Sequence, residues 1–183
     1  MAERPMASLL QRLRSALGRR ADEGAASLDG VRIRAMRLAD VAGVVAIEEQ
    51  SFGSPWRPSS YGRAVREGRQ HFFVAECLGR LVGYAGFWVE GRSAHIAKLA
   101  VHPDLRRQGI GSVLLDHLLD EIRRVGLCRA YLEVRQSNEA AQKLYARFGF
   151  RFERVQPRAY PNNGEDAFVL MRDGLLKLDP PAD

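Results

Sequence analysis

The spacing of apolar residues changes several times along the chain, and each change marks an expected element. Apolar and polar residues alternate in VRIRAMR, from Val31, which predicts a strand. Helical spacing follows from about residue 40, and a loop, SFGSPWRPSS, leads into a short helix expected over 59–67. Three stretches rich in β-branched and aromatic residues then predict an antiparallel meander over 71–78, 81–90 and 93–101.

Strands and helices alternate in the second half of the chain. Residues 110–125 carry apolar side chains at helical spacing and are followed by Gly126, which predicts a helix with a glycine C-cap. We expect a strand over 130–136, a helix over 137–148 that is capped by Ser137 or Asn138, and two strands, over 150–155 and 166–172, around the PNNG turn. This order predicts an α+β fold with a mixed, mostly antiparallel central sheet of about six to seven strands and helices on both faces.

The first thirty residues have a different pattern. Leu9, Leu10, Leu13 and Leu17 recur at helical spacing among arginines, and a linker, ADEGAASLDG, follows them. We therefore expect an N-terminal extension with an amphipathic basic helix over 1–30, one domain over 31–178 and a tail over 179–183. The role of this helix stays open between an incidental extension and docking to a membrane surface or a partner.

Composition narrows the class of protein. A chain of 183 residues that is 46% hydrophobic and 27% charged is typical of one soluble domain, and no apolar run is long enough to span a bilayer. The net charge is +6, but the arginines are spread without a nucleic-acid-binding motif, so we expect no nucleic-acid partner. Cys77 and Cys128 lack CxxC spacing and the histidines lack metal spacing, which favours free thiols, a cytoplasmic location and no metal site.

Candidate chemistry concentrates in LAVHPDLRRQGIGSVLL, where a strand, a basic turn and a long helix follow one another. The first turn of a helix leaves backbone N–H groups unpaired, and Gly109 and Gly111 lack the Cβ atoms that would block a ligand. Arg106 and Arg107 add mobile positive charge at the rim. The turn lacks the third glycine of a Rossmann fingerprint and the lysine of a Walker loop, so it predicts a phosphate site of another kind.

The pattern RxxGxG, between a strand and a long helix, resembles the acetyl-CoA signature of the GCN5-related N-acetyltransferase (GNAT) superfamily. The resemblance covers about residues 31–172, and the blocks SFGSPW, YLEVRQSNEAAQKLYARFGF and YPNNGEDAFVLM are similar to the RimI-type protein N-terminal acetyltransferases. It implies the GNAT fold, acetyl-CoA as co-substrate, and a protein or peptide N-terminus, such as that of a ribosomal protein, as partner. The CoA-binding positions that it implies are Leu99, Ala100, Val101, Arg106, Arg107, Gln108, Gly109, Ile110, Gly111, Ser112 and Asn138.

The resemblance also implies two catalytic side chains, Glu133 as general base and Tyr145 as general acid. The pattern alone leaves alternatives open. Glu133 is on the polar face of its strand, which suits either a cleft or an ion pair with a neighbouring arginine, and Tyr145 lies beside an apolar stripe, which suits a core residue. Direct attack by the amine is expected, with Glu133 acting directly or through water, and a thiol intermediate on Cys128 has no neighbouring histidine to support it.

Aromatic residues in loops are the expected substrate contacts. Phe52, Trp56 and Tyr160 match positions that flank the peptide in the similar enzymes, although they could instead anchor the loops to the core. Ala159 stands where related sequences often have a second tyrosine, so peptide contacts could differ. N-terminal protein acetylation is the leading hypothesis; acetylation of a small amine and a non-catalytic acyl-CoA-binding module are the alternatives. The sequence does not indicate an oligomeric state.

Overall fold

The computed structural model describes residues 30–67 and 70–176. The expected N-terminal helix and its linker lie outside these ranges, apart from Gly30, and so does the expected tail over 179–183. In the described part of the chain, no helix is long and apolar enough to cross a membrane.

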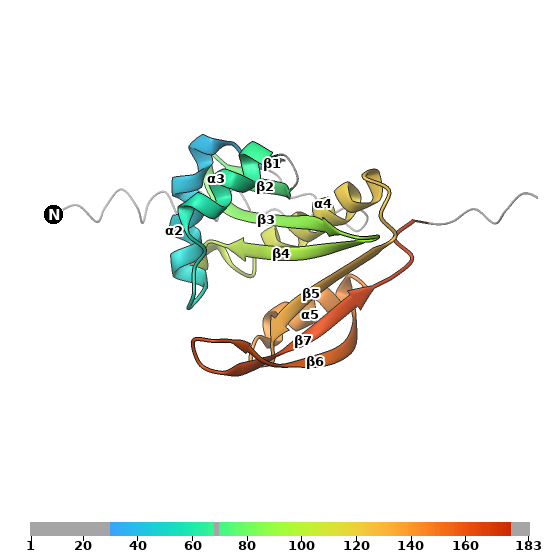
Figure 1. The fold of residues 1–183 in the computed structure, drawn as a ribbon. Coiled ribbons are helices and arrows are strands. Elements are labelled where there is room, and N and C mark those ends of the chain that lie inside the picture. The colour runs from blue at the N-terminus through green and yellow to red at the C-terminus, as the bar shows by residue number, and fades with distance from the viewer. Residues whose placement is uncertain (1–29, 68–69, 177–183) are drawn as a thin grey trace, which may run out of the picture. The chain divides into compact units, whose positions relative to one another are not determined.

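Seven strands form the sheet of the described chain, in the order β1-β2-β3-β4-β5-β7-β6 (Figure 1). β4 pairs with β5 in parallel, whereas β1 with β2, β5 with β7 and β6 with β7 are antiparallel. This arrangement confirms the predicted mixed sheet. The strands are β1 (Val31–Ala35), β2 (Gln70–Cys77), β3 (Arg80–Glu90), β4 (Ser93–Val101), β5 (Arg129–Arg135), β6 (Arg151–Tyr160) and β7 (Glu165–Arg172).

Four α-helices accompany the strands within the described ranges: α2 (Val41–Ser51), α3 (Pro58–Glu67), α4 (Ile110–Arg124) and α5 (Glu139–Arg147). Two short 3-10 turns, η1 (Leu38–Asp40) and η2 (Pro103–Leu105), precede α2 and the glycine-containing turn. The helices fall within a residue or two of their predicted bounds. β6 extends to Tyr160, beyond the predicted strand, because it continues through Pro157 towards the hairpin turn.

Two compact units make up the chain. Of the residues that the structure describes, the first unit holds those up to Gly86 together with Lys98–His117, and the second holds Phe87–Ala97 together with those from Leu118 onward. β3, β4 and α4 each contribute residues to both units.

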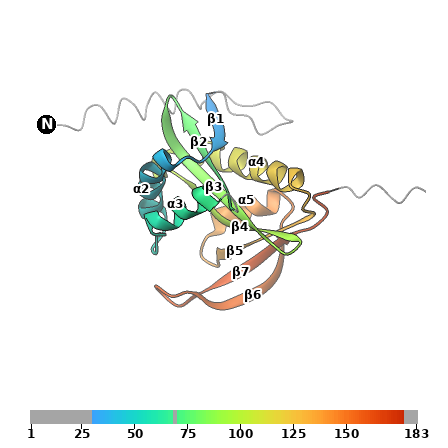
Figure 2. The same cartoon turned by 45° about the horizontal axis from the view of Figure 1, so that its top comes forward.

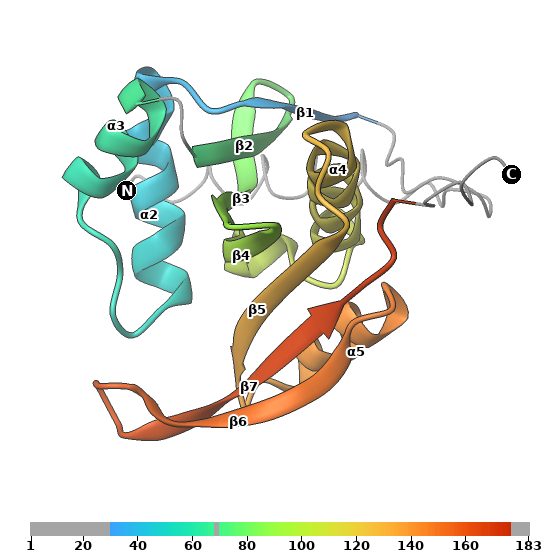
Figure 3. The same ribbon diagram turned by 45° about the vertical axis from the view of Figure 1, so that its right-hand side comes forward.

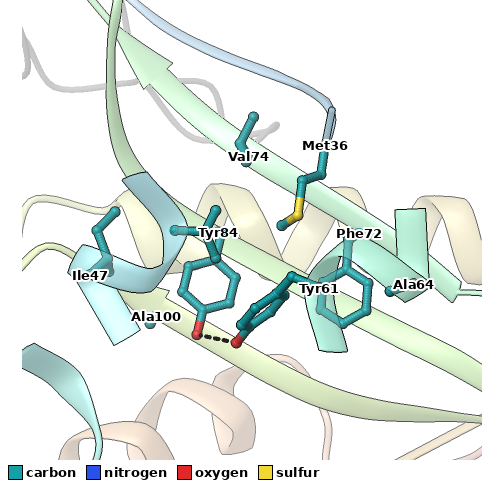
Figure 4. Packing of buried hydrophobic residues seen from close by; sticks show 9 residues of the cluster. Met36, Ile47, Tyr61, Ala64, Phe72, Val74, Tyr84 and Ala100 are labelled. Carbon is teal, nitrogen blue, oxygen red and sulfur yellow. Dashed lines mark hydrogen bonds between the residues drawn. The ribbon is translucent and has the colours of Figure 1, made fainter. Parts of the chain in front are cut away.

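The core of the first unit lies between its strands and the helices α2 and α3 (Figure 3). Figure 4 shows Tyr61 and Tyr84 pointing toward each other, with their hydroxyls 3.1 Å apart. Val44 and Ile47 of α2 are buried as the helical spacing predicted. On the other side of β3, Gly83 has no side chain; a Cβ there would lie 2.9 Å from the carbonyl oxygen of Ala100, so glycine permits the start of α4 to pack closely.

The second unit is built on β5, β7 and β6, which run side by side with α5 along them (Figure 2). β5 alternates strictly: Ala130, Leu132 and Val134 are buried, while Tyr131, Glu133 and Arg135 are half-buried on the opposite face. Because successive strand residues point to opposite faces, the candidate base Glu133 shares its face of the strand with Tyr131 and Arg135. The predicted alternation of β5 is thereby confirmed.

Candidate functional site

The turn before α4 forms an anion cradle from backbone atoms of the first unit. Within the described chain, the N–H groups of residues 107–111 donate to no backbone carbonyl, and the first turn-closing bonds come from Ser112 and Val113 to Gly109 O. Arg107 and Gly109 both have a positive φ, 63° and 88°, in the left-handed region that backbone anion-binding turns use. Five unpaired donors at the positive end of a helix fit a pyrophosphate.

Arg106 is held more firmly than the sequence predicted. Its Nε donates to the carbonyl oxygen of Val101 at 3.2 Å, and its Nη2 donates to Oγ of Ser51 at 3.1 Å. Ser51 is the last residue of α2, so the guanidinium also lies near the negative end of that helix. Arg106 therefore joins the turn to β4 and α2, and its side chain, like that of Arg107, is exposed.

The strand before the turn is partly embedded in the core. Ala100 and Val101 are buried, and Leu99 is half-buried. In the turn, Ile110 is buried and anchors α4, whereas Gln108, Gly111 and Ser112 are half-buried. The candidate CoA-binding residues of the first unit thus form one continuous segment from strand to helix.

Glu133 has a histidine as its partner. Its Oε2 lies 2.6 Å from Nε2 of His95 on β4, and its side chain is 28% exposed, enough to meet a ligand. The ion pair with a neighbouring arginine, the alternative left open by the sequence, is absent within the described residues, because Arg135 pairs with Glu165 at 2.8 Å.

Tyr145 is buried on α5, with its ring 5.8 Å from that of Phe150 in an edge-to-face contact. Burial raises the pKa of Tyr145, and the neighbouring Tyr160 raises it further. Burial also raises the pKa of Tyr160; Arg135 acts against this shift, and the Glu133 and Glu165 carboxylates add to it. Glu133 on β5, Tyr145 on α5 and Tyr160 on β6 all belong to the second unit, and both phenols keep their protons at neutral pH.

The hairpin between β6 and β7 is fixed by Arg135. The guanidinium lies 3.7 Å from the centre of the Tyr160 ring and donates to Glu165, Asn162 and Asn163. Hydrogen bonds from Ser137, then from Arg135 and Asn163, lower the pKa of Glu165 to about 2. Tyr160, expected in a loop, is the last residue of β6 and is therefore held at a defined position.

Asn138 caps α5. Its Oδ1 accepts a hydrogen bond from the backbone N–H of Ala141 at 3.1 Å, a typical N-cap contact. This resolves the choice between Ser137 and Asn138 as the cap.

Phe52 and Trp56 pack against the core of the first unit, as the anchor interpretation predicted. Between them lies Lys98, whose Nζ is 4.2 Å from the Phe52 ring centre and 4.8 Å from the Trp56 ring centre. The same ammonium pairs with Oε1 of the fully buried Glu48 at 2.7 Å. Glu48 also accepts from the backbone N–H of Trp56 and from the Tyr61 hydroxyl, so it fastens the loop that follows α2.

Within the described ranges, no group of three or more His, Cys, Asp or Glu residues has the arrangement of a metal site. Cys77 is buried and Cys128 half-buried, and both are free thiols. His95, Glu48 and Lys98 are the important side chains that sequence reasoning missed. The contacts that reveal them join residues 38 and 50 positions apart, which no local pattern reports.

The known proteins that this chain resembles include acetyltransferases. The Acetyltransferase (GNAT) family matches residues 41–150 of this chain. A Bacillus subtilis protein provisionally named a ribosomal protein bS18-alanine N-acetyltransferase is 37% identical over 139 residues, covering 75% of this chain and 92% of its own length. The N-alpha-acetyltransferase RimI of Mycobacterium tuberculosis is 36% identical over 154 residues, covering 81% of this chain and 96% of its own.

A solved structure has the same fold. The crystal structure of the ribosomal-protein-S18-alanine N-acetyltransferase from Escherichia coli superposes with a TM-score of 0.75 at 30% identity, over 84% of this chain and 99% of that one.

Proposed function

Since the chain belongs to the acetyltransferase (GNAT) family, we propose that it transfers the acetyl group of acetyl-CoA to the α-amino group of a protein N-terminus. The relatives named as N-terminal acetyltransferases match it over more than nine-tenths of their own length, which supports this substrate class. The proposal includes a first residue such as alanine, a ribosomal protein as partner and a cytoplasmic location. The single observation that carries the chemistry is the partly exposed Glu133 carboxylate, held by His95 in the same unit as the buried Tyr145 phenol.

The turn before α4 is the proposed holder of acetyl-CoA. Its unpaired N–H groups over 107–111 match the charge of the CoA pyrophosphate, and Gly109 and Gly111 leave room for it. When bound, acetyl-CoA supplies an acetyl group activated as a thioester. The residues Leu99 to Val101 are proposed to lie along its pantetheine arm.

Glu133 and Tyr145 have complementary proton roles in this proposal. An amine attacks only when neutral, and an α-amino group is roughly a fifth neutral near pH 7.4, against about 0.1% for a lysine. The Glu133 carboxylate accepts the proton of the ammonium, directly or through water. The Tyr145 phenol, which keeps its proton because burial raises its pKa, donates to the leaving sulfur.

Tyr160 and the loop holding Phe52 and Trp56 are proposed to flank the peptide N-terminus. Tyr160 is held by the Arg135 guanidinium, which lies 3.7 Å from the centre of its ring. Phe52 and Trp56 pack against the core, so their side chains lose little conformational entropy when a peptide binds beside them.

A substrate panel tests this function. Thiol release from acetyl-CoA is measured with short peptides that begin with Ala, Ser, Met or Pro, with an N-terminally blocked lysine peptide and with spermidine. We expect turnover with the Ala and Ser peptides, and kcat/KM at least about 100-fold lower for the blocked peptide and spermidine. Faster turnover of spermidine would replace the proposal with a small-amine acetyltransferase, and calorimetric binding of acetyl-CoA without turnover would replace it with a binding module.

A further inference from the structure

His95 is the one side chain that donates to the candidate base Glu133 within the described residues. His95 is on β4 opposite Tyr131 in the parallel register with β5, so its ring lies next to the strand that carries Glu133. Its Nε2 is 2.6 Å from Oε2 of Glu133. Because an ionised carboxylate only accepts hydrogen bonds, Nε2 carries the proton at this contact.

Three side chains fix the imidazole ring in place. It stacks on Tyr131 with ring centres 4.5 Å apart and planes 2° from parallel, and its centre lies 5.1 Å from that of the Trp88 ring in an edge-to-face arrangement. Nδ1 is buried and makes no hydrogen bond to a described residue, and the carboxylate oxygen Oε1 of Glu90 lies 3.5 Å from it. Glu90 itself is held by the Trp88 indole N–H at 2.7 Å and by the Tyr131 hydroxyl. A ring packed in this way has little rotational freedom, so the direction of its Nε2–H is set before any ligand binds.

The hydrogen bond with His95 engages only one of the two carboxylate oxygens of Glu133, Oε2. No described residue donates to Oε1, so this oxygen remains available to a substrate proton. A carboxylate on a half-exposed strand face would otherwise turn about its terminal bond, because that torsion is soft. The hydrogen bond from His95 removes this freedom, and fixed orientation of a base contributes to the rate of proton transfer.

We propose that His95 is a positioning residue for the reaction: its Nε2–H holds Oε2 of Glu133 so that Oε1 accepts the ammonium proton of the substrate. This inference rests on the proposed role of Glu133 as general base.

Two substitutions separate the hydrogen bond from the packing. His95→Phe keeps a ring that can stack on Tyr131 and meet Trp88 but removes the donor, whereas His95→Gln removes the ring and keeps an amide N–H of similar reach. We expect His95→Phe to lower kcat by about 10- to 100-fold, the effect of losing a hydrogen bond to a charged group, with KM for both substrates within about two-fold of wild type. We expect His95→Gln to recover most of kcat.

A coupling measurement distinguishes the failure of this inference from the failure of the proposed function. If His95 acts through Glu133, then His95→Phe lowers kcat in the wild-type background and has no further effect in a Glu133→Gln background. Equal losses in both backgrounds, or a His95→Phe variant as active as wild type, would overturn the positioning role. Unchanged kcat in Glu133→Gln alone would instead overturn the role of Glu133.

A measurement on the wild-type protein does not depend on whether the variants fold. Nitrogen NMR of the histidine side chains reports which ring nitrogen carries a proton. We expect a proton on Nε2 of His95. A neutral ring protonated only on Nδ1 would contradict the inference.

Discussion

At the residue scale, Tyr145 is the side chain whose environment best suits its proposed role. Its phenol is buried, its pKa is raised, and no described residue accepts its proton in a hydrogen bond. A phenol in this state is protonated at neutral pH, and its O–H is free to donate to a sulfur on which negative charge develops.

Tyr145→Phe is therefore expected to lower kcat by about 100-fold or more while leaving the fold intact, because the ring and its contact with Phe150 are retained. Steady-state kinetics with an Ala-first peptide gives kcat, and thermal unfolding provides the folding control. A variant with wild-type kcat would remove Tyr145 from the mechanism.

Glu48 and Lys98 form a buried ion pair whose two members depend on each other. Glu48→Gln leaves the Lys98 ammonium, only 10% exposed, without its carboxylate, so we expect a loss of about 3–5 kcal/mol in the free energy of unfolding. The double variant Glu48→Gln/Lys98→Met removes both charges and is expected to be more stable than the single variant. Urea unfolding measures both, and a single variant within about 1 kcal/mol of wild type would show that the pair is not needed.

At the element scale, the turn before α4 depends on the backbone conformation of Gly109. Its φ of 88° disfavours any residue with a Cβ, and its N–H is one of the unpaired donors. Gly109→Ala is expected to weaken CoA binding by about 10-fold or more in calorimetry. Gly79→Ala is the matched control, since Gly79 also has a positive φ, 74°, and has open space around it. Equal affinities in the two variants would contradict the proposed pyrophosphate site.

The β6–β7 hairpin carries a pH-sensitive contact. The pKa of Glu165 falls to about 2 from an ordinary value of 4.5, so its hydrogen bonds stabilise the fold fully above about pH 4.5 and are lost as the pH falls towards 2. The difference in unfolding free energy between wild type and Glu165→Gln should accordingly shrink over that interval. A difference that stays constant with pH would show that Glu165 titrates normally.

At the scale of the whole molecule, the sequence predicts the elements well because their signals are local. Alternation in β5, the helical stripe of α4 and the glycine after it depend on neighbouring residues, and the structure confirms them. The end of β6 was not predictable, because Pro157 usually argues against a strand interior.

The sequence predicts the candidate site only where its residues follow one another along the chain. The glycine-containing turn is such a segment, and its backbone has the expected form. The contact of Glu133 with His95 and that of Glu48 with Lys98 join separate strands and helices, so they follow from sheet register and packing. The roles of Glu133, Tyr145 and the CoA-binding residues remain predictions.

The central claim is that the protein acetylates an α-amino group. The most direct measurement uses one peptide that begins with alanine and contains an internal lysine, incubated with the protein and acetyl-CoA and then fragmented by tandem mass spectrometry. We predict an acetyl group on the N-terminal alanine, formed at least about 100-fold faster than on the lysine side chain. Acetylation of the lysine at an equal or greater rate would contradict the account.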